Sequence, residues 1–236
     1  SKKNDDLSDW IIINNNINSS VFMGYDRLEI EGNICKYREA KSEGGKINYH
    51  IVTDTTTFYP EGGGQIGDTG EIISSGDEIK VIDTFKDTND IIHLTKDLPS
   101  DLNSKVKLKV NNTRRSMIES NHTSTHLLHQ ALRKILGSHV EQRGSMISED
   151  MFRFDFSHPS KLSDNDIDSI NGFVNDRIKD SIPLIENREE DYNTAIKNGA
   201  IGLFTEKYED KVRTVKFNES YELCGGTHVK KTSKLK

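Results

Sequence analysis

The sequence predicts an α+β fold in which a small N-terminal β-barrel-like subdomain precedes a core that mixes helices and strands. Three observations lead to this prediction. Short β-branched segments separated by glycine turns fill residues 21–112. A long stretch of helical spacing begins at residue 114. Two pairs of metal-binding residue types lie far apart in the second part, so they can meet only if the chain folds between them.

The composition limits the class of protein. A chain of 236 residues can form one large domain or two small ones. Charged residues make up 30% and the net charge is −6, but the periodic apolar segments argue against disorder. No apolar run approaches the roughly 20 residues of a membrane span, so we expect no membrane partner. Two cysteines cannot form a disulfide framework, which favours a reducing, intracellular compartment.

Residues 1–20 are polar and rich in asparagine, which predicts a linker or a disordered lead-in. From residue 21 to 112 the chain reads as strands. Residues 47–52 and 79–85 are short and β-branched, and residues 105–110 alternate between polar and apolar. Glycine-containing turns separate these segments, at 44–45, 62–64 and 75–76. Short strands at regular intervals predict a small barrel or meander.

The pattern changes near residue 112, so residues 113–236 are predicted to form a separate α+β core. Apolar residues recur at helical spacing in 114–136, and Gly137 is a natural helix stop. A second helix is expected to begin at Ser163, where Asp166 can complete a capping box.

The rest of the core alternates between strands and one more helix. Residues 152–156 alternate as a strand. A third, shorter helix is predicted over residues 189–198, ending at Gly199. Residues 212–217 and 221–223 read as strands that lead into a glycine-containing loop at 224–228.

His122 and His126 form the first half of a candidate metal site. Residues i and i+4 of a helix lie on one face, so both imidazoles can face the same ion. His129 lies on the same stripe, and a His126/His129 pair is a geometric alternative.

Cys224 and His228 form the second half of the candidate site. Gly225 and Gly226 between them allow a tight turn and a close approach of the backbone. One thiolate and three imidazoles suit tetrahedral Zn²⁺. A zinc ion closed by four protein ligands is normally structural, whereas a catalytic zinc keeps a position for water, and the residues leave both alternatives open. A buried cysteine beside an incidental histidine is the plain alternative.

Several motifs in order resemble the editing domain of alanyl-tRNA synthetase, which is related to free-standing trans-editing proteins and to the editing domain of threonyl-tRNA synthetase. The matching segments are 22–26 (FMGYD), 57–70 (TFYPEGGGQIGDTG), 121–128 (NHTSTHLL), 139–145 (HVEQRGS), 153–156 (RFDF) and 224–229 (CGGTHV). The resemblance covers about residues 21 to 230. It implies an internal piece of the synthetase without the aminoacylation domain. The departures are small: Ser124 stands where the family usually has alanine.

The resemblance implies an aminoacyl-tRNA deacylase that hydrolyses the ester of mischarged seryl-tRNA(Ala), and of glycyl-tRNA(Ala) as a second substrate. Zinc would activate water or hold the amino group of the substrate. It assigns the site residues as follows: metal ligands His122, His126, Cys224 and His228; catalytic residues Thr125, Gln142 and Ser145; substrate-binding residues Gly62, Gly63, Gly64, Gln65 and Arg143.

The same resemblance predicts the partners and the location. The partners are the acceptor end of tRNA(Ala) carrying serine or glycine and the remainder of the synthetase chain, in the cytoplasm or in an organelle. The basic clusters are local and the chain is acidic, so we expect weak, salt-sensitive tRNA binding by this piece alone. The alternative function is a zinc-stabilised tRNA-binding module without catalysis.

Overall fold

The computed structural model describes residues 6–14, 20–42, 44–202 and 208–235, and it has a mixed α+β fold in which sheet predominates. The chain divides into two compact units. The first unit comprises Ser1–Gly62 and Ile66–Arg115, and the second comprises Gly63–Gln65 and Ser116–Lys236. The division falls inside a helix close to residue 112, where the sequence pattern changes.

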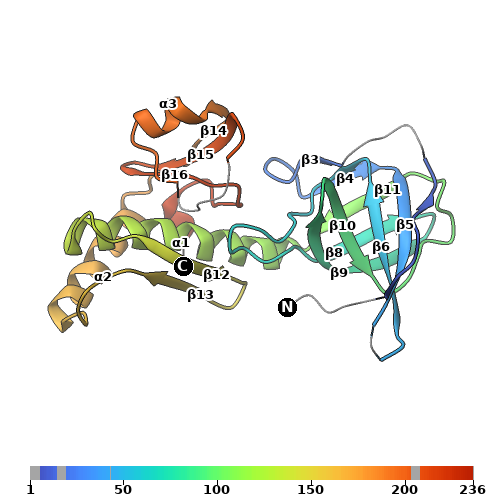
Figure 1. Cartoon of the computed structure of the whole chain (residues 1–236), viewed down its shortest axis with the longest axis horizontal. Helices are drawn as coiled ribbons and strands as arrows, with labels where there is room; N and C mark the ends of the chain where they lie inside the picture. The colour runs from blue at the N-terminus through green and yellow to red at the C-terminus, as the bar shows by residue number, and fades with distance from the viewer. Residues whose placement is uncertain (1–5, 15–19, 43, 203–207, 236) are drawn as a thin grey trace. The chain divides into compact units, whose positions relative to one another are not determined.

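The first unit is built from strands (Figure 1). Their bounds are β1 Asp6–Leu7, β2 Ile11–Ile12, β3 Val21–Phe22, β4 Glu29–Gly32, β5 Ile34–Lys41, β6 Ile47–Thr53, β7 Thr55–Thr56, β8 Gly70–Ser74, β9 Asp77–Asp87, β10 Asp90–Thr95 and β11 Val106–Val110. The main sheet runs in the order β1-β5-β6-β10-β9-β8-β11-β4, and β2 also pairs with β5. Its neighbouring strands are antiparallel.

Alternation decides which side chains of this sheet are buried. In β11 the residues of the sequence VKLKV alternate between buried and exposed, because successive side chains of a strand point to opposite faces. The buried members join Ile34, Ile51, Phe58 and Ile72 in one apolar core. The strands predicted at 47–52, 79–85 and 105–110 are confirmed as β6, β9 and β11.

Two expectations for this part of the chain hold only in part. The path of paired strands has two ends, β1 and β4, so the described residues do not close into a barrel. The lead-in is more ordered than its polar composition predicts, since β1 and β2 both pair with β5. Backbone hydrogen bonds to β5 and the packing of Ile13 against the apolar core hold this segment in place. Residues 1–5 and 15–19 of the lead-in lie outside the described residues.

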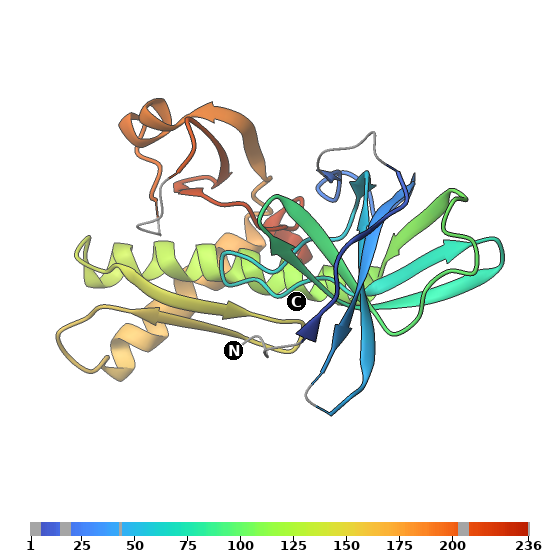
Figure 2. The same cartoon turned by 45° about the vertical axis from the view of Figure 1, so that its right-hand side comes forward.

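The second unit is organised around a long helix, α1 (Asn112–Leu136), whose first turn belongs to the first unit. The other elements are β12 Gln142–Ile147, β13 Phe152–Phe156, α2 Asp164–Lys179, β14 Ile185–Asp191, α3 Tyr192–Lys197, β15 Lys211–Phe217, β16 Ser220–Leu223 and the 3-10 turn Thr232–Lys234. Within this unit α1 runs between the β12–β13 hairpin and the β14-β15-β16 sheet (Figures 1 and 2). Among the described residues, every helix is too short or too polar to cross a bilayer.

The helix α1 contributes side chains to two separate apolar clusters. Leu127 packs with Val215 and Phe217 of β15, whereas Ala131 and Leu132 pack in the cluster that contains Phe154 of β13. The predicted helices at 114–136 and from Ser163 and the strand at 152–156 are confirmed as α1, α2 and β13. The helix predicted over 189–198 is correct only in its second half.

The error at that third helix has a physical reason. Residues up to Asp191 continue β14, which pairs with β15, and the helix begins only after Asp191. The Asp191 side chain accepts a hydrogen bond from the Thr194 backbone N–H and caps the helix. Pairing with β15 therefore overrides the helical propensity of the glutamates that precede Asp191.

Candidate metal centre

Four side chains from two distant segments converge in the second unit. The ligand group consists of His122 and His126 of α1 with Cys224 and His228 from the loop after β16, and one candidate ligand atom of each lies within 4.8 Å of the others. All three imidazoles are buried, and Cys224 is half-buried. The Cys224 Sγ atom lies 3.5 Å from His122 Nε2 and 3.3 Å from His228 Nε2.

These separations suit one tetrahedral cation. Zn–N bonds of about 2.0–2.1 Å and a Zn–S bond of about 2.3 Å place tetrahedral ligand atoms roughly 3.3 to 3.6 Å apart. One thiolate and three imidazoles are also a donor set that zinc accepts. The donor chemistry of the group and the two distances from Cys224 Sγ therefore fit a bound metal ion.

The electrostatics of the ligand group favour a thiolate. Burial alone would raise the pKa of Cys224, but the imidazoles of His122, His228 and His126 outweigh it and hold that pKa well below the usual range. Burial lowers the pKa of His126, yet the Glu222 carboxylate and the Cys224 thiolate bring it to about 9. Burial and the neighbouring His122 lower the pKa of His228.

Gln65 fixes the orientation of the His122 ring. Its side-chain oxygen accepts hydrogen bonds from the Thr227 backbone N–H at 2.9 Å and from His122 Nδ1 at 2.8 Å. A backbone N–H can only donate, so the Gln65 atom facing it is the carbonyl oxygen, and His122 must carry its proton on Nδ1. Nε2 of His122 is then unprotonated and directed toward Cys224.

Thr123 supports His228 from the same helix. Its Oγ1 atom lies 3.1 Å from His228 Nδ1 and accepts a bond from the Val229 backbone N–H at 3.2 Å. His228 Nε2, the nitrogen nearer to Cys224, is again left free of this contact. The histidines that face Cys224 through Nε2 are thus held by their Nδ1 atoms, as is typical of metal-binding histidines.

The loop 224–228 is held by Arg213 of β15, a residue that no sequence pattern singles out. The Arg213 guanidinium donates to the carbonyl oxygens of Cys224 at 2.8 Å and Gly226 at 2.7 Å, and it pairs with Glu186 at 2.6 Å. An arginine within an alternating strand carries no sequence signal of this role. Its fork of donors closes the loop through backbone atoms.

The two glycines of the loop are not equivalent. A Cβ atom on Gly226 would overlap the His122 ring and lie 2.8 Å from Gln65 Oε1, whereas a Cβ atom on Gly225 meets nothing within 4 Å. The close backbone approach expected from the two glycines therefore requires glycine at position 226 and not at position 225.

The structure distinguishes the two histidine pairs that spacing leaves open. His129 Nδ1 lies 2.9 Å from Glu222 Oε1, and His129 is not part of the ligand group. His122 and His126 supply the α1 side of the group instead.

Comparison with known proteins places the chain among the synthetases. The family model for class II (A) tRNA synthetases matches residues 2–114, and the one for the threonyl and alanyl tRNA synthetase second additional domain matches residues 212–236. The alanine–tRNA ligase of Christiangramia forsetii is 49% identical over 96% of this chain, and that of Cytophaga hutchinsonii is 47% identical over 98%. The chain belongs to the alanyl-tRNA synthetase family. It spans about a quarter (26%) of the length of these relatives.

The other residues that the resemblance assigns to the site lie in different settings. The Thr125 hydroxyl is buried and donates to the His122 carbonyl at 2.7 Å. Gln142 and Ser145 lie on β12, opposite Phe156 and Phe154 of β13. Arg143 is exposed and pairs with Glu141 at 2.9 Å.

The glycine-rich segment 62–65 divides between the two units. Gly62 belongs to the first unit, and Gly63, Gly64 and Gln65 belong to the second. The Gly64 carbonyl accepts a bond from the Ile147 backbone N–H at 2.8 Å, and Gln65 bridges to Ile147. Gly64 has a φ of +83°, and an added Cβ would strike the Ser145 side chain. The segment 63–65 therefore joins β12 and the ligand group.

Proposed function

We propose that the chain is an editing domain that hydrolyses the ester bond between tRNA(Ala) and a wrongly attached serine or glycine, at a site that contains Zn²⁺. The observation that carries the proposal is the convergence of His122, His126, Cys224 and His228 in a chain of the alanyl-tRNA synthetase family. A cation bound there would supply Lewis-acid chemistry, either to a water molecule or to the amino group of the substrate.

The protein's own residues would bind and orient the aminoacyl end. We assign Thr125, Gln142 and Ser145 to the chemical step and Gly62, Gly63, Gly64, Gln65 and Arg143 to substrate binding. The link between β12 and segment 63–65 supports this assignment, because it ties Ser145 to the segment whose Gln65 contacts His122. The exposed Arg143 guanidinium is free to approach a phosphate, although it would exchange its solvent-exposed pairing with Glu141.

Selectivity for serine has a physical basis. A synthetic site for alanine rejects serine poorly, because serine adds only a hydroxyl group, and it cannot exclude glycine by size. A second site can reject correctly charged alanine if a buried polar group there pairs with the serine hydroxyl. That group would be left unpaired by alanine, at a cost of about 1–3 kcal/mol.

The number of protein ligands is an argument for a second candidate function. A zinc ion with four protein ligands is usually structural, so a zinc-stabilised tRNA-binding module without catalysis is the second candidate. The two candidates differ in turnover and not in metal content.

The test is hydrolysis of seryl-tRNA(Ala), glycyl-tRNA(Ala) and alanyl-tRNA(Ala) by the purified chain, with bound zinc measured on the same samples. We expect hydrolysis of the first two, sparing of the third, and loss of both zinc and hydrolysis in Cys224→Ala. Cys35→Ala is the matched control, because Cys35 is buried in the first unit and distant in sequence from the ligands. Stoichiometric zinc without turnover would support the binding module instead.

A further inference from the structure

Glu222 is a buried carboxylate whose described partners are histidines. It lies on β16 and is only 2% exposed, which is rare for glutamate without a charged or hydrogen-bonding partner. Its Oε1 atom lies 2.9 Å from His129 Nδ1, and its Oε2 atom lies 3.5 Å from His126 Nδ1. One carboxylate therefore faces two imidazoles of α1, and only one of them belongs to the ligand group.

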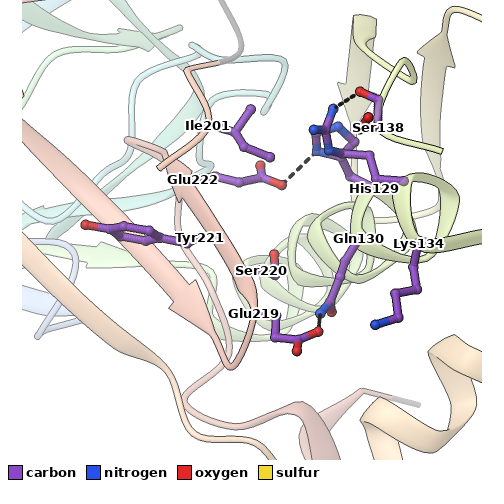
Figure 3. Close-up of a pocket in the computed structure, with 10 residues that line it drawn as sticks. His129, Gln130, Lys134, Ser138, Ile201, Glu219, Ser220, Tyr221 and Glu222 are labelled. Carbon is purple, nitrogen blue, oxygen red and sulfur yellow. Dashed lines mark hydrogen bonds and ion pairs between the residues drawn. The ribbon is translucent and has the colours of Figure 1, made fainter. Parts of the chain in front are cut away.

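The two carboxylate oxygens of Glu222 contact different histidines. Oε1 is within hydrogen-bond distance of His129, as Figure 3 shows at the wall of a pocket of ≈ 230 Å³. Neither Oε2 nor His126 Nδ1 has another hydrogen-bond partner among the described residues. The separation of 3.5 Å is slightly longer than a hydrogen bond, so a small movement of either side chain completes the pair.

The contact with Glu222 determines which nitrogen of His126 can bind a cation. When Nδ1 faces Glu222, Nε2 is the ring nitrogen of His126 left for a cation, as Nε2 is in His122 and His228 beside Cys224. The three imidazoles then have three different Nδ1 partners: Gln65, Glu222 and Thr123. Glu222 is the only one of these partners that carries a charge, so it also offsets the positive charge of a bound cation.

We propose that Glu222 is a positioning residue for the metal centre: it holds His126 with Nδ1–H toward its carboxylate and Nε2 toward the cation, while His129 fixes the carboxylate. This inference rests on the metal site of the proposed function and assigns to it a chain of contacts, His129–Glu222–His126, that leads to the ion. His129 acts through Glu222 and not as a ligand.

A purely structural role for Glu222 makes a different prediction. A carboxylate that only satisfies the core would change the stability of the protein when replaced, without changing how tightly the ion is held. Zinc affinity and the tautomer of His126 therefore separate the two roles, and neither requires a deacylation assay.

The first measurement is the affinity of the whole chain for Zn²⁺, by competition with a chelator of known affinity at one pH. Glu222→Gln keeps the size of the side chain and removes its charge, and we expect zinc affinity to fall about 10- to 100-fold. Glu219→Gln is the matched control, because Glu219 lines the same pocket and contacts Gln130 instead of a ligand. We expect its zinc affinity to be unchanged. His129→Gln should lower the affinity by less than Glu222→Gln.

The second measurement is the ¹⁵N NMR signature of the His126 ring in the unmodified, zinc-loaded protein, so it does not depend on whether Glu222→Gln folds. We expect a proton on Nδ1 and none on Nε2. Wild-type zinc affinity in a folded Glu222→Gln variant, or a proton on Nε2 of His126, would overturn the inference while leaving the metal site intact. Absence of zinc binding by the unmodified protein would overturn both the inference and the zinc site.

Discussion

At the scale of single residues, the metal centre depends on contacts that sequence spacing cannot express. The i, i+4 rule and the cysteine loop propose the four members of the ligand group, but spacing also leaves a His126/His129 pair open. The supporting atoms of Thr123, Arg213 and Glu222 come from residue types that are common in ordinary helices and strands. Their roles exist only once the two segments meet, so no local pattern reveals them.

Gly226 and Gly225 give a test of the close approach in the metal loop. Gly226→Ala should displace His122, because the new methyl group overlaps the ring, and we expect zinc affinity to fall about tenfold or more. Gly225→Ala introduces the same methyl group into open space and should retain zinc binding. A chelator competition on both variants checks this, and equal affinities would contradict the model of a tight Gly226–His122 contact.

His93 gives the first unit a pH-dependent stability. Burial lowers the pKa of His93 to about 4, although its hydrogen bond with Ile51 opposes the shift. The unfolded chain, with an ordinary histidine pKa near 6.5, binds more protons than the folded one between these values. The contribution of His93 to the free energy of unfolding should therefore be complete above about pH 6.5 and decrease as the pH drops toward 4. The decrease is about 2 kcal/mol between pH 7 and pH 5.

The single tryptophan, Trp10, lies in the first unit and reports its unfolding by fluorescence. Denaturant titrations at the two pH values measure the loss. His93→Asn, which does not titrate, should be less stable at neutral pH but should show a smaller change. An identical pH effect in wild type and variant would assign the effect to other groups.

At the scale of helices and strands, the sequence predicts long periodic elements well and short ones poorly. The helix α1 and the strands β6, β9, β11 and β13 follow from periodicity, because each buries one face in a core. The start of α3 and the pairing of β1 and β2 depend on partners elsewhere in the chain, and this information is not local. Whether the sheet closes into a barrel also depends on pairing between distant strands, and the path of paired strands ends at β1 and β4.

Ser163 caps α2, as its spacing from Asp166 predicts. Its hydroxyl accepts from the Asp166 backbone N–H, and the Asp166 side chain accepts from the Ser163 backbone N–H at 2.9 Å. Ser163→Ala should lower the free energy of unfolding of the second unit by about 1 kcal/mol. Ser169→Ala makes the same chemical change on the exposed middle of α2 and should be neutral or slightly stabilising. Denaturation followed by circular dichroism distinguishes them, and equal losses would exclude a capping effect.

At the scale of the whole molecule, the two units differ in what stabilises them. The first unit has an apolar core and a buried ion pair, in which Arg115 contacts Asp68 and the carbonyl oxygens of Gly24 and Thr57. The second unit has three smaller clusters and contains the ligand group. A bound ion should therefore stabilise the second unit selectively.

Removal of metal tests this division. A ligand that binds only the folded state adds about 2.7 kcal/mol when its free concentration is one hundred times its dissociation constant. With a chelator, we expect the unfolding transition of the second unit, followed by circular dichroism, to move to lower denaturant. The transition followed by Trp10 fluorescence should stay in place. A parallel shift of both signals would show that the units unfold together.

The short stretch Gly63–Gln65 has a consequence for how this protein can be divided. A recombinant piece that starts at residue 116 would contain every ligand yet leave His122 Nδ1 without its amide acceptor. The metal centre thus draws on two separate segments of the chain, residues 63–65 and residues 116–236. Truncation at the border before residue 116 should therefore weaken zinc binding. A recombinant protein would need to keep the upstream sequence, or have residues 63–65 attached by circular permutation, to retain full zinc affinity.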